Sequence, residues 1–271
     1  APVIAETYKS GDKTMKLADT DWAKEVYSTA LMQNYNLSLS RGGNNGGSSL
    51  SVNYMDHEGM CRNTDYKSFN SRLSGDYHFL DNRLRIGENL AVTRWTRHNN
   101  PAGIEEQIFK LMPMVPVYAV DGTYGGGYVD VLNDTPNPIR LTDNEANNKH
   151  EYWRIFGNAY VEVEPIKNLV IRSNFGVNYY NEENSIFTPK WQEGSRAVAL
   201  NELEVSNSEQ FNWIWTNQIQ YSVDFGKNSL VALLGVEAKK EKFNYFKAYG
   251  TGLEYEDLDY RYLDSVTSGK N

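Results

Sequence analysis

The chain has 271 residues, and it is rich in aromatic side chains although it is polar overall: 35 residues are Phe, Trp or Tyr, the hydrophobic fraction is 40%, and the mean hydropathy is −0.62. A net charge of −8 excludes a nucleic-acid-binding protein of the basic-patch type. The single cysteine, Cys61, excludes an internal disulfide framework and a thiolate zinc cluster. Since no run approaches about 18 apolar residues, no transmembrane helix is expected.

The two ends of the chain are polar. Ala1 is not followed by the charged and apolar regions of a secretory signal peptide, and the last four residues are Ser-Gly-Lys-Asn. We therefore expect a fragment of a longer protein, or a mature chain trimmed at both ends.

Alternation of apolar and polar residues predicts antiparallel β-strands. It is clearest between Phe211 and Phe225, where nearly every odd position is apolar and nearly every even position is polar. Short polar turns join such strands in pairs. Glu88 interrupts one apolar face, and the sequence offers no reason for it. Four hairpins are predicted: 33–54 with a turn at 41–47, 66–94 with a turn at 81–82, 150–180 with a turn at 165–168, and 208–246 with a turn at 226–228.

The connections between the hairpins are much longer than the turns. The predicted loops cover residues 99–149, 181–205 and 250–271, and we expect all three at the same end of the sheet. A structureless loop of about 50 residues is unusual in a compact soluble domain but typical of an outer-membrane barrel. A soluble β-sandwich produces the same alternation. The aromatic residues at strand ends and the contrast in loop length favour the barrel.

Several stretches resemble the barrel domain of the SusC/RagA family of TonB-dependent outer-membrane transporters. Together they cover about residues 19–140, and beyond them the similarity is architectural. The stretches are Asp-Thr-Asp-Trp at 19–22, Glu-Val-Tyr at 25–27, Met-Gln-Asn-Tyr-Asn-Leu-Ser-Leu-Ser at 32–40, Asp-Tyr-Lys-Ser-Phe at 65–69, Leu-Asp-Asn-Arg-Leu-Arg-Ile-Gly-Glu-Asn-Leu at 80–90, Met-Pro at 112–113 and Pro-Val-Tyr at 116–118, and Asn-Pro at 137–138.

The resemblance implies an all-β, antiparallel, up-and-down transmembrane barrel of 22 strands, filled by an N-terminal plug and located in the outer membrane of a Gram-negative cell. About eight strands in four hairpins would come from this chain. Residues 1–30 would lead from the missing plug into the barrel, and residues 31–271 would form a partial barrel whose long loops are extracellular.

No catalytic constellation is present, because the four histidines lie far apart and no metalloprotease motif occurs. We expect no enzyme activity, no cofactor and no resident metal. Asp121, Asp130 and Asp134 carry oxygen ligands that suit calcium, but their spacing is not that of an EF-hand, and solvated loop acids are the simpler interpretation.

Loop aromatics are the candidate ligand contacts, because rings stack on the flat faces of sugars. These are Tyr118, Tyr124, Tyr128 and Trp191. Rings at the edge of the outward apolar face are instead expected to form a girdle at the membrane interface, in contact with outer-membrane lipid. This predicted girdle contains Trp153, Phe211, Trp213, Trp215 and Tyr221. The charged residues on the opposite face, among them Arg72, Arg154, Arg172 and Glu162, are expected to line a wet lumen.

The function implied by the resemblance is import of glycans or other nutrient oligomers, with peptides also possible. The implied partners are TonB and a SusD-like outer-membrane lipoprotein. Two alternatives remain: a complete eight-stranded outer-membrane barrel with an adhesive or structural role, and a soluble carbohydrate-binding β-domain.

Overall fold

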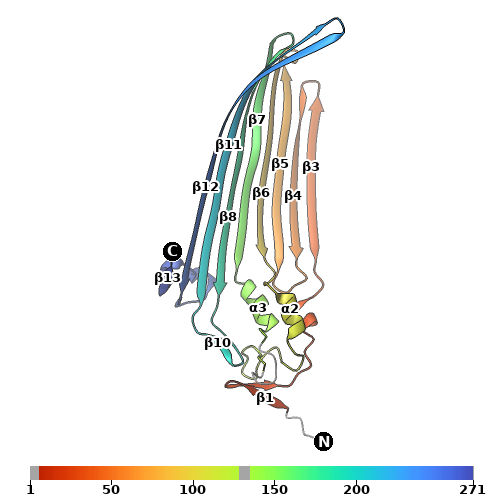
Figure 1. Ribbon diagram of the computed structural model, residues 1–271. Helices are drawn as coiled ribbons and strands as arrows, with labels where there is room; N and C mark the ends of the chain where they lie inside the picture. The colour runs from red at the N-terminus through yellow and green to blue at the C-terminus, as the bar shows by residue number, and fades with distance from the viewer. Residues whose placement is uncertain (1–5, 128–134, 271) are drawn as a thin grey trace.

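One antiparallel sheet dominates the computed structural model, which describes residues 6–127 and 135–270. Its strands follow the order β13-β12-β11-β8-β7-β6-β5-β4-β3, and Figure 1 shows them as a single layer. The predicted all-β, up-and-down arrangement of about eight strands in four hairpins is confirmed. The long strands are β3 (Met32–Gly43), β4 (Gly46–Glu58), β5 (Asp65–Phe79), β6 (Leu84–His98), β7 (Lys149–Ile166), β8 (Leu169–Thr188), β11 (Glu202–Phe225) and β12 (Asn228–Thr251).

The two ends of the sheet differ in what connects the strands. Short turns close all four hairpins at one end, and the helices and short strands gather at the other (Figure 1). The prediction that the long connections share one end is therefore confirmed; we call this the loop end. Its elements are β1 (Thr7–Ser10), β2 (Lys13–Lys16), α1 (Trp22–Val26), α2 (Ile104–Lys110), α3 (Pro138–Glu145), β9 (Trp191–Glu193), β10 (Arg196–Val198), η1 (Leu258–Tyr260), η2 (Leu263–Ser265) and β13 (Ser268–Lys270). No helix among the described residues is long and apolar enough to cross a bilayer.

The strands extend farther toward the loop end than the alternation predicts. The predicted loop 181–205 is reduced to residues 189–201, which contain the β9–β10 hairpin. At 181–184 the sequence is Asn-Glu-Glu-Asn, so both faces of β8 are polar and no alternation marks the strand. The first turn is also shorter than predicted, because β3 ends at Gly43 and β4 begins at Gly46.

The strand register places the apolar residues of neighbouring strands side by side on one face. Ile219 is opposite Ile171 on one side and Leu234 on the other. Leu234 and Val236 are 70% and 66% exposed, so this face is not covered by a second layer of the described chain. We call it the outward face, and the opposite one the inner face. The residues predicted to share the outward face do so: Phe211, Trp213, Ile219, Val223, Leu234, Val236, Val161 and Val177.

Glu88 also lies on the outward face, and the structure supplies its partner. Glu88 is opposite Ala159 of β7, in the register row that continues to Phe175 and Trp215. The Tyr77 hydroxyl donates a hydrogen bond to Glu88 Oε1 at 3.3 Å. The acidic side chain that interrupts the apolar pattern is therefore hydrogen-bonded on its own face.

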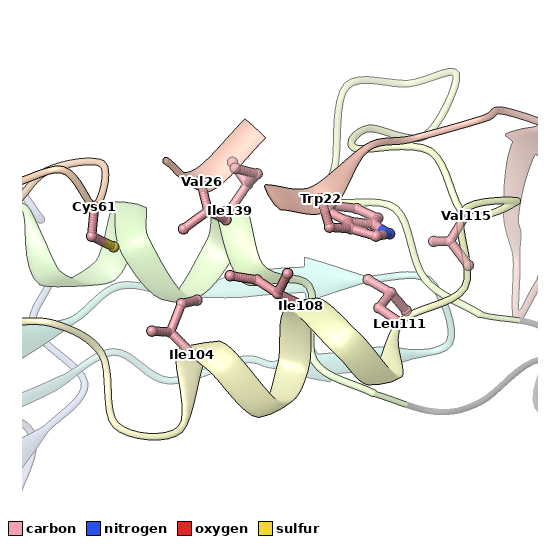
Figure 2. Close-up of a cluster of buried hydrophobic side chains, with 8 residues drawn as sticks. All are labelled: Trp22, Val26, Cys61, Ile104, Ile108, Leu111, Val115 and Ile139. Carbon is pink, nitrogen blue, oxygen red and sulfur yellow. The ribbon is translucent and has the colours of Figure 1, made fainter. Parts of the chain in front are cut away.

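The main buried core lies at the loop end instead of between two sheets. It joins the segment before β3, the β4–β5 connection and the 99–148 connection (Figure 2). In α2, Ile104 and Ile108 are one turn apart and point inward, whereas Phe109 is 88% exposed. We call this group the loop-end core; it consists of Trp22, Val26, Cys61, Ile104, Ile108, Leu111, Val115 and Ile139.

Local signals explain the two helices that flank this core. The side chain of Asp21 accepts a hydrogen bond from the Lys24 backbone N–H at 3.2 Å and caps α1. Asn137 caps α3 by accepting from the Ile139 N–H at 3.0 Å, and Pro138 occupies the first turn. Residues 99–149, expected as a structureless loop, thus contain two helices that pack together with α1.

Candidate ligand-binding site

Tyr118 and Tyr124, two predicted ligand contacts, pack against each other at the loop end. Their ring centroids are 5.9 Å apart, and their backbones form an isolated antiparallel bridge. The Tyr124 hydroxyl donates to Asp143 Oδ2 at 3.1 Å, and burial raises the pKa of this phenol well above its ordinary value. Tyr124 therefore stays a neutral donor and ties its loop to α3. Tyr118 is 47% exposed and offers more of its ring to solvent.

Trp191 begins β9, and its ring is covered by a cation. The guanidinium of Arg140 lies 3.9 Å from the ring centroid. Arg140 Nε also donates to Glu193 Oε2 at 2.5 Å, and these two side chains are 6% and 2% exposed. The structure thus gives Trp191 a packing role within the loop end. The fourth predicted contact, Tyr128, lies outside the described residues.

The acidic loop residues considered for calcium separate in the structure. Asp121 forms an ion pair with Lys13 at 2.7 Å and accepts hydrogen bonds from Thr123. These contacts hold the pKa of the Asp121 carboxyl well below its usual range. Asp130 and Asp134 lie outside the described residues. Among the described residues, no group of three potential ligands could hold a metal ion.

All five predicted girdle residues lie on the outward face. Trp213 is opposite Val177, and the register then continues through Gly157 to Leu90. The Trp215 indole donates to Ser173 Oγ at 2.9 Å, and the Arg94 guanidinium lies 5.2 Å from the Trp153 ring centroid. Phe211 and Tyr221 share this face through the odd positions of β11. Their contact with lipid stays a prediction.

The outward face changes from apolar to charged at the register row that contains Trp153. On the loop-end side of this row, Glu151 pairs with Arg94 at 2.7 Å and with Lys149 at 3.0 Å. On the other side, the row of Ile219, Ile171 and Leu234 is apolar. A charged zone thus meets an apolar one near Trp153. On β12 the charges reach farther, because Lys242 and Lys240 are opposite Phe211 and Trp213.

The inner face carries the charged residues that were expected to line a lumen. Glu162 is central, since it pairs with Arg85 at 3.0 Å and with Arg172 at 3.5 Å. The Arg172 guanidinium also lies 3.9 Å from the Tyr160 ring centroid. The Tyr160 hydroxyl and His78 both contact Asp76. Glu162 thus links β7 to β6 and β8, whereas His78 and Asp76 pair within β5.

A row of stacked rings crosses the inner face nearer the loop end. Trp95 and Tyr152 stack at a centroid distance of 5.1 Å, and Tyr152 and Tyr180 at 6.0 Å. Tyr66 flanks Trp95 at 6.1 Å, and the Arg97 guanidinium lies 4.7 Å from the Trp95 ring centroid. We call these four rings the inner aromatic row.

The comparisons with known proteins agree with this geometry. No protein-family model matches the chain. TonB-dependent receptor P26 of Formosa agariphila is 26% identical over 222 residues, and SusC of Bacteroides thetaiotaomicron is 24% identical over 131 residues. The structure of the RagAB peptide transporter superposes with a TM-score of 0.73 at 20% identity and covers 98% of this chain. The 'closed-closed' state of the RagAB peptide importer gives a TM-score of 0.71 at 18% identity.

The chain is a partial barrel of the SusC/RagA type.

The chain covers only a small part of each of these relatives. This SusC/RagA-type segment matches 80% of its own length to receptor P26 but only 22% of that receptor, and it matches 13% of SusC. It covers 31% of the RagAB chains. The chain thus spans about a fifth of the curated relative P26 and about a third of the solved structures.

The sequence did not reveal the inner aromatic row of the SusC/RagA-type barrel. Trp95 lies just outside the predicted hairpin 66–94, so its position opposite Tyr152 could not be predicted. Pairing of β6 with β7 sets the two opposite each other. The partners of the loop rings, Arg140 and Glu193, were missed because they are 53 residues apart.

Proposed function

We propose that the full-length protein containing this chain is a TonB-dependent outer-membrane transporter that imports nutrient oligomers, either glycans or peptides. One observation carries the proposal: a single sheet with an apolar outward face and a charged, aromatic inner face matches the RagAB fold over 98% of the chain. Its relatives in sequence are TonB-dependent receptors. Such a wall suits a protein that separates lipid from an aqueous lumen.

Neither alternative fits the sheet as well. A complete eight-stranded barrel needs β3 to pair with β12, but within the described residues β3 pairs only with β4. A soluble sandwich needs a second sheet over the apolar face, and Leu234 is 70% exposed there. Further strands on both edges would complete the wall, as in the larger plugged barrel that the resemblance implies.

The height of the apolar zone supports the membrane assignment. A strand rises roughly 40 Å from Phe211 to Val223, and a tilt of about 45° leaves roughly 29 Å, close to the thickness of a bilayer core. On β7 the zone ends at Trp153, where the outward face becomes charged. We propose that the loop end lies outside the cell and that Trp153 and Phe211 mark the outer interface. Tyr221 is opposite Leu169, near the short turns, and would lie at the other edge of the apolar zone.

Ile219→Arg should destabilise the barrel by about 2–4 kcal/mol, because it would place a guanidinium on the lipid face near the middle of the apolar zone. The neighbouring change Gln218→Arg places the same side chain on the inner face and should have little effect. Urea unfolding of the full-length protein in lipid vesicles measures both. Equal losses for the two variants would contradict the assignment of the faces.

The proposed partners are TonB and a SusD-like lipoprotein that covers the loop end. Exposed apolar side chains there support a covering partner: Met60 is 67%, Phe109 88% and Val120 64% exposed. We retain the loop aromatics as proposed ligand contacts, with Tyr118 the most accessible of those described.

A deletion strain tests the proposed function. Deleting the gene, deleting the TonB gene, or adding a protonophore should each abolish energy-dependent uptake of the oligosaccharide or peptide mixture on which the wild-type strain grows. The gene restored on a plasmid should recover uptake, and the tagged protein should fractionate with the outer membrane. Normal uptake of every mixture by the deletion strain would contradict the proposal.

A further inference from the structure

An open hollow in the inner face lies beside the edge of the apolar zone. It occupies about 370 Å³ across β7, β8, β11 and β12. Gly176 forms part of its floor and leaves the space open, since a Cβ there would lie 3.1 Å from Ile214 Cγ2. Asn212, which also lines the hollow, is located between Phe211 and Trp213 of the outward face. The hollow is therefore near the level of the girdle, toward the loop end.

Four asparagine side chains line the hollow, and β12 adds the charged residues Glu237, Lys239 and Glu241. Asn158 Nδ2 donates to Asn174 Oδ1 at 2.7 Å, and Asn178 Oδ1 accepts from Arg154 Nε at 3.0 Å. Asn212 supplies a fourth amide, and Phe156, 53% exposed, adds apolar surface. An asparagine side chain has the donor and acceptor groups of a peptide bond.

Two buried polar atoms of the described residues have no hydrogen-bond partner, and both belong to the inner face. One is the acceptor Asn212 Oδ1 in the hollow, and the other is the donor Arg97 Nε beside the inner aromatic row. A buried polar atom without a partner costs about 1–3 kcal/mol, so each is a place where a ligand group can bind. The register row of Asn212 crosses β8 at Asn178, and the row of Arg97 crosses it at Asn184. The two rows are therefore six residues of β8 apart, or roughly 20 Å along the strand.

The nature of these groups favours a polyamide over a sugar. Rings that bind sugars need a free face, but Trp95, Tyr152 and Tyr180 stack on one another. The Arg154 guanidinium lies 5.4 Å from the Phe156 ring centroid and covers one of its faces. The unpartnered acceptor requires an N–H or O–H donor, and the unpartnered donor requires an oxygen. A peptide backbone supplies N–H and C=O groups along its whole length.

We propose that this hollow, with Asn212 as its central acceptor, is a binding subsite for the backbone of an extended oligopeptide that reaches toward Arg97. The inference rests on the proposed function, because it assigns a substrate class to the transporter's lumen. Apolar ligand side chains would rest against Phe156 and Ile214.

The Asn212→Leu variant shows whether Asn212 contributes to peptide affinity or to the stability of the protein. It removes the unpartnered acceptor while keeping a similar volume, so the ligand-free protein should be equally or more stable. Affinity for peptides should nevertheless fall about tenfold, the value of roughly one hydrogen bond. Gln220→Leu, on the same strand and face but toward the short turns, is the matched control and should not change affinity.

The measurement is equilibrium dialysis of the purified full-length transporter in detergent against a tryptic digest of casein, with bound peptides quantified by mass spectrometry. A parallel dialysis uses dextran and xylan oligosaccharides. Unchanged peptide affinity in Asn212→Leu would overturn the subsite, as would binding of the oligosaccharides alone. A lower melting temperature for ligand-free Asn212→Leu would also overturn it, because Asn212 would then contact another part of the protein. Loss of uptake in the deletion strain would meanwhile stand as independent support for the transporter.

Discussion

Replacing Glu193 by alanine should destabilise the loop end by about 3–5 kcal/mol, because the Arg140 guanidinium would remain buried without its counter-charge. The two side chains are 6% and 2% exposed, and their closest atoms are 2.5 Å apart. Arginine does not lose its proton in proteins, so it cannot relieve the penalty by becoming neutral. The Trp191 ring under the guanidinium offers only partial compensation. Hydrogen exchange of α3 and of the β9–β10 hairpin in the full-length protein measures the loss.

A double replacement distinguishes a buried charge from simple loss of packing. Arg140→Met combined with Glu193→Leu removes both charges and keeps most of the volume, so it should recover most of the stability lost in Glu193→Ala. Lys24→Ala removes the exposed ion pair with Asp21 and should have little effect. Equal destabilisation by the single and double replacements would contradict this interpretation of the pair.

Trp22→Ala should destabilise the loop-end core by about 3–5 kcal/mol, the usual range for deleting a large buried aromatic side chain. Trp22 is 3% exposed, packs with residues of α2 and α3, and its indole donates to the Met112 carbonyl at 3.3 Å. The cavity would release the segment before β3 from the 99–148 connection. The long strands of the sheet should keep their protection, since the core lies beyond their ends.

Limited proteolysis of the full-length protein in micelles tests this separation. Trp22→Ala should be cleaved within residues 6–30 and 99–148 at protease concentrations that leave the wild type intact. Phe109→Ala is the control, because that ring on α2 is 88% exposed and its removal leaves no cavity. Cleavage throughout β3–β12 in Trp22→Ala would mean that the loop-end core also holds the sheet together.

The sheet could be predicted from the sequence because its two faces meet different surroundings. Between Phe211 and Phe225 successive side chains of β11 point to opposite faces, so apolar and polar residues alternate in the sequence. The turns could also be predicted, because Asn and Gly tolerate positive φ angles well. The φ angles are 68° at Asn82, 70° at Asn168 and 63° at Gly226. The hairpins and the outward residues followed from these two signals.

Other features depend on contacts between residues that are far apart in the sequence. The strands continue past Trp153, and at 181–184 both faces of β8 are polar, so the alternation disappears there. The loop-end core brings Trp22 together with Ile139, which are separated by more than a hundred positions. Of the predicted loop contacts, Tyr124 and Trp191 proved to be bound to Asp143 and Arg140, and no local pattern indicates such partners. The inner aromatic row likewise depends on the β6–β7 register.

The central claim is that one face of this sheet contacts lipid and the other an aqueous lumen. Its most direct test is electron paramagnetic resonance of spin labels placed singly at residues 211–224 of the full-length protein in lipid vesicles. Odd positions such as 219 should be accessible to oxygen, which concentrates in lipid, and even positions such as 218 to a water-soluble nickel chelate. Accessibility that fails to alternate, or odd positions shielded from both reagents, would contradict the barrel wall and indicate a covered apolar face.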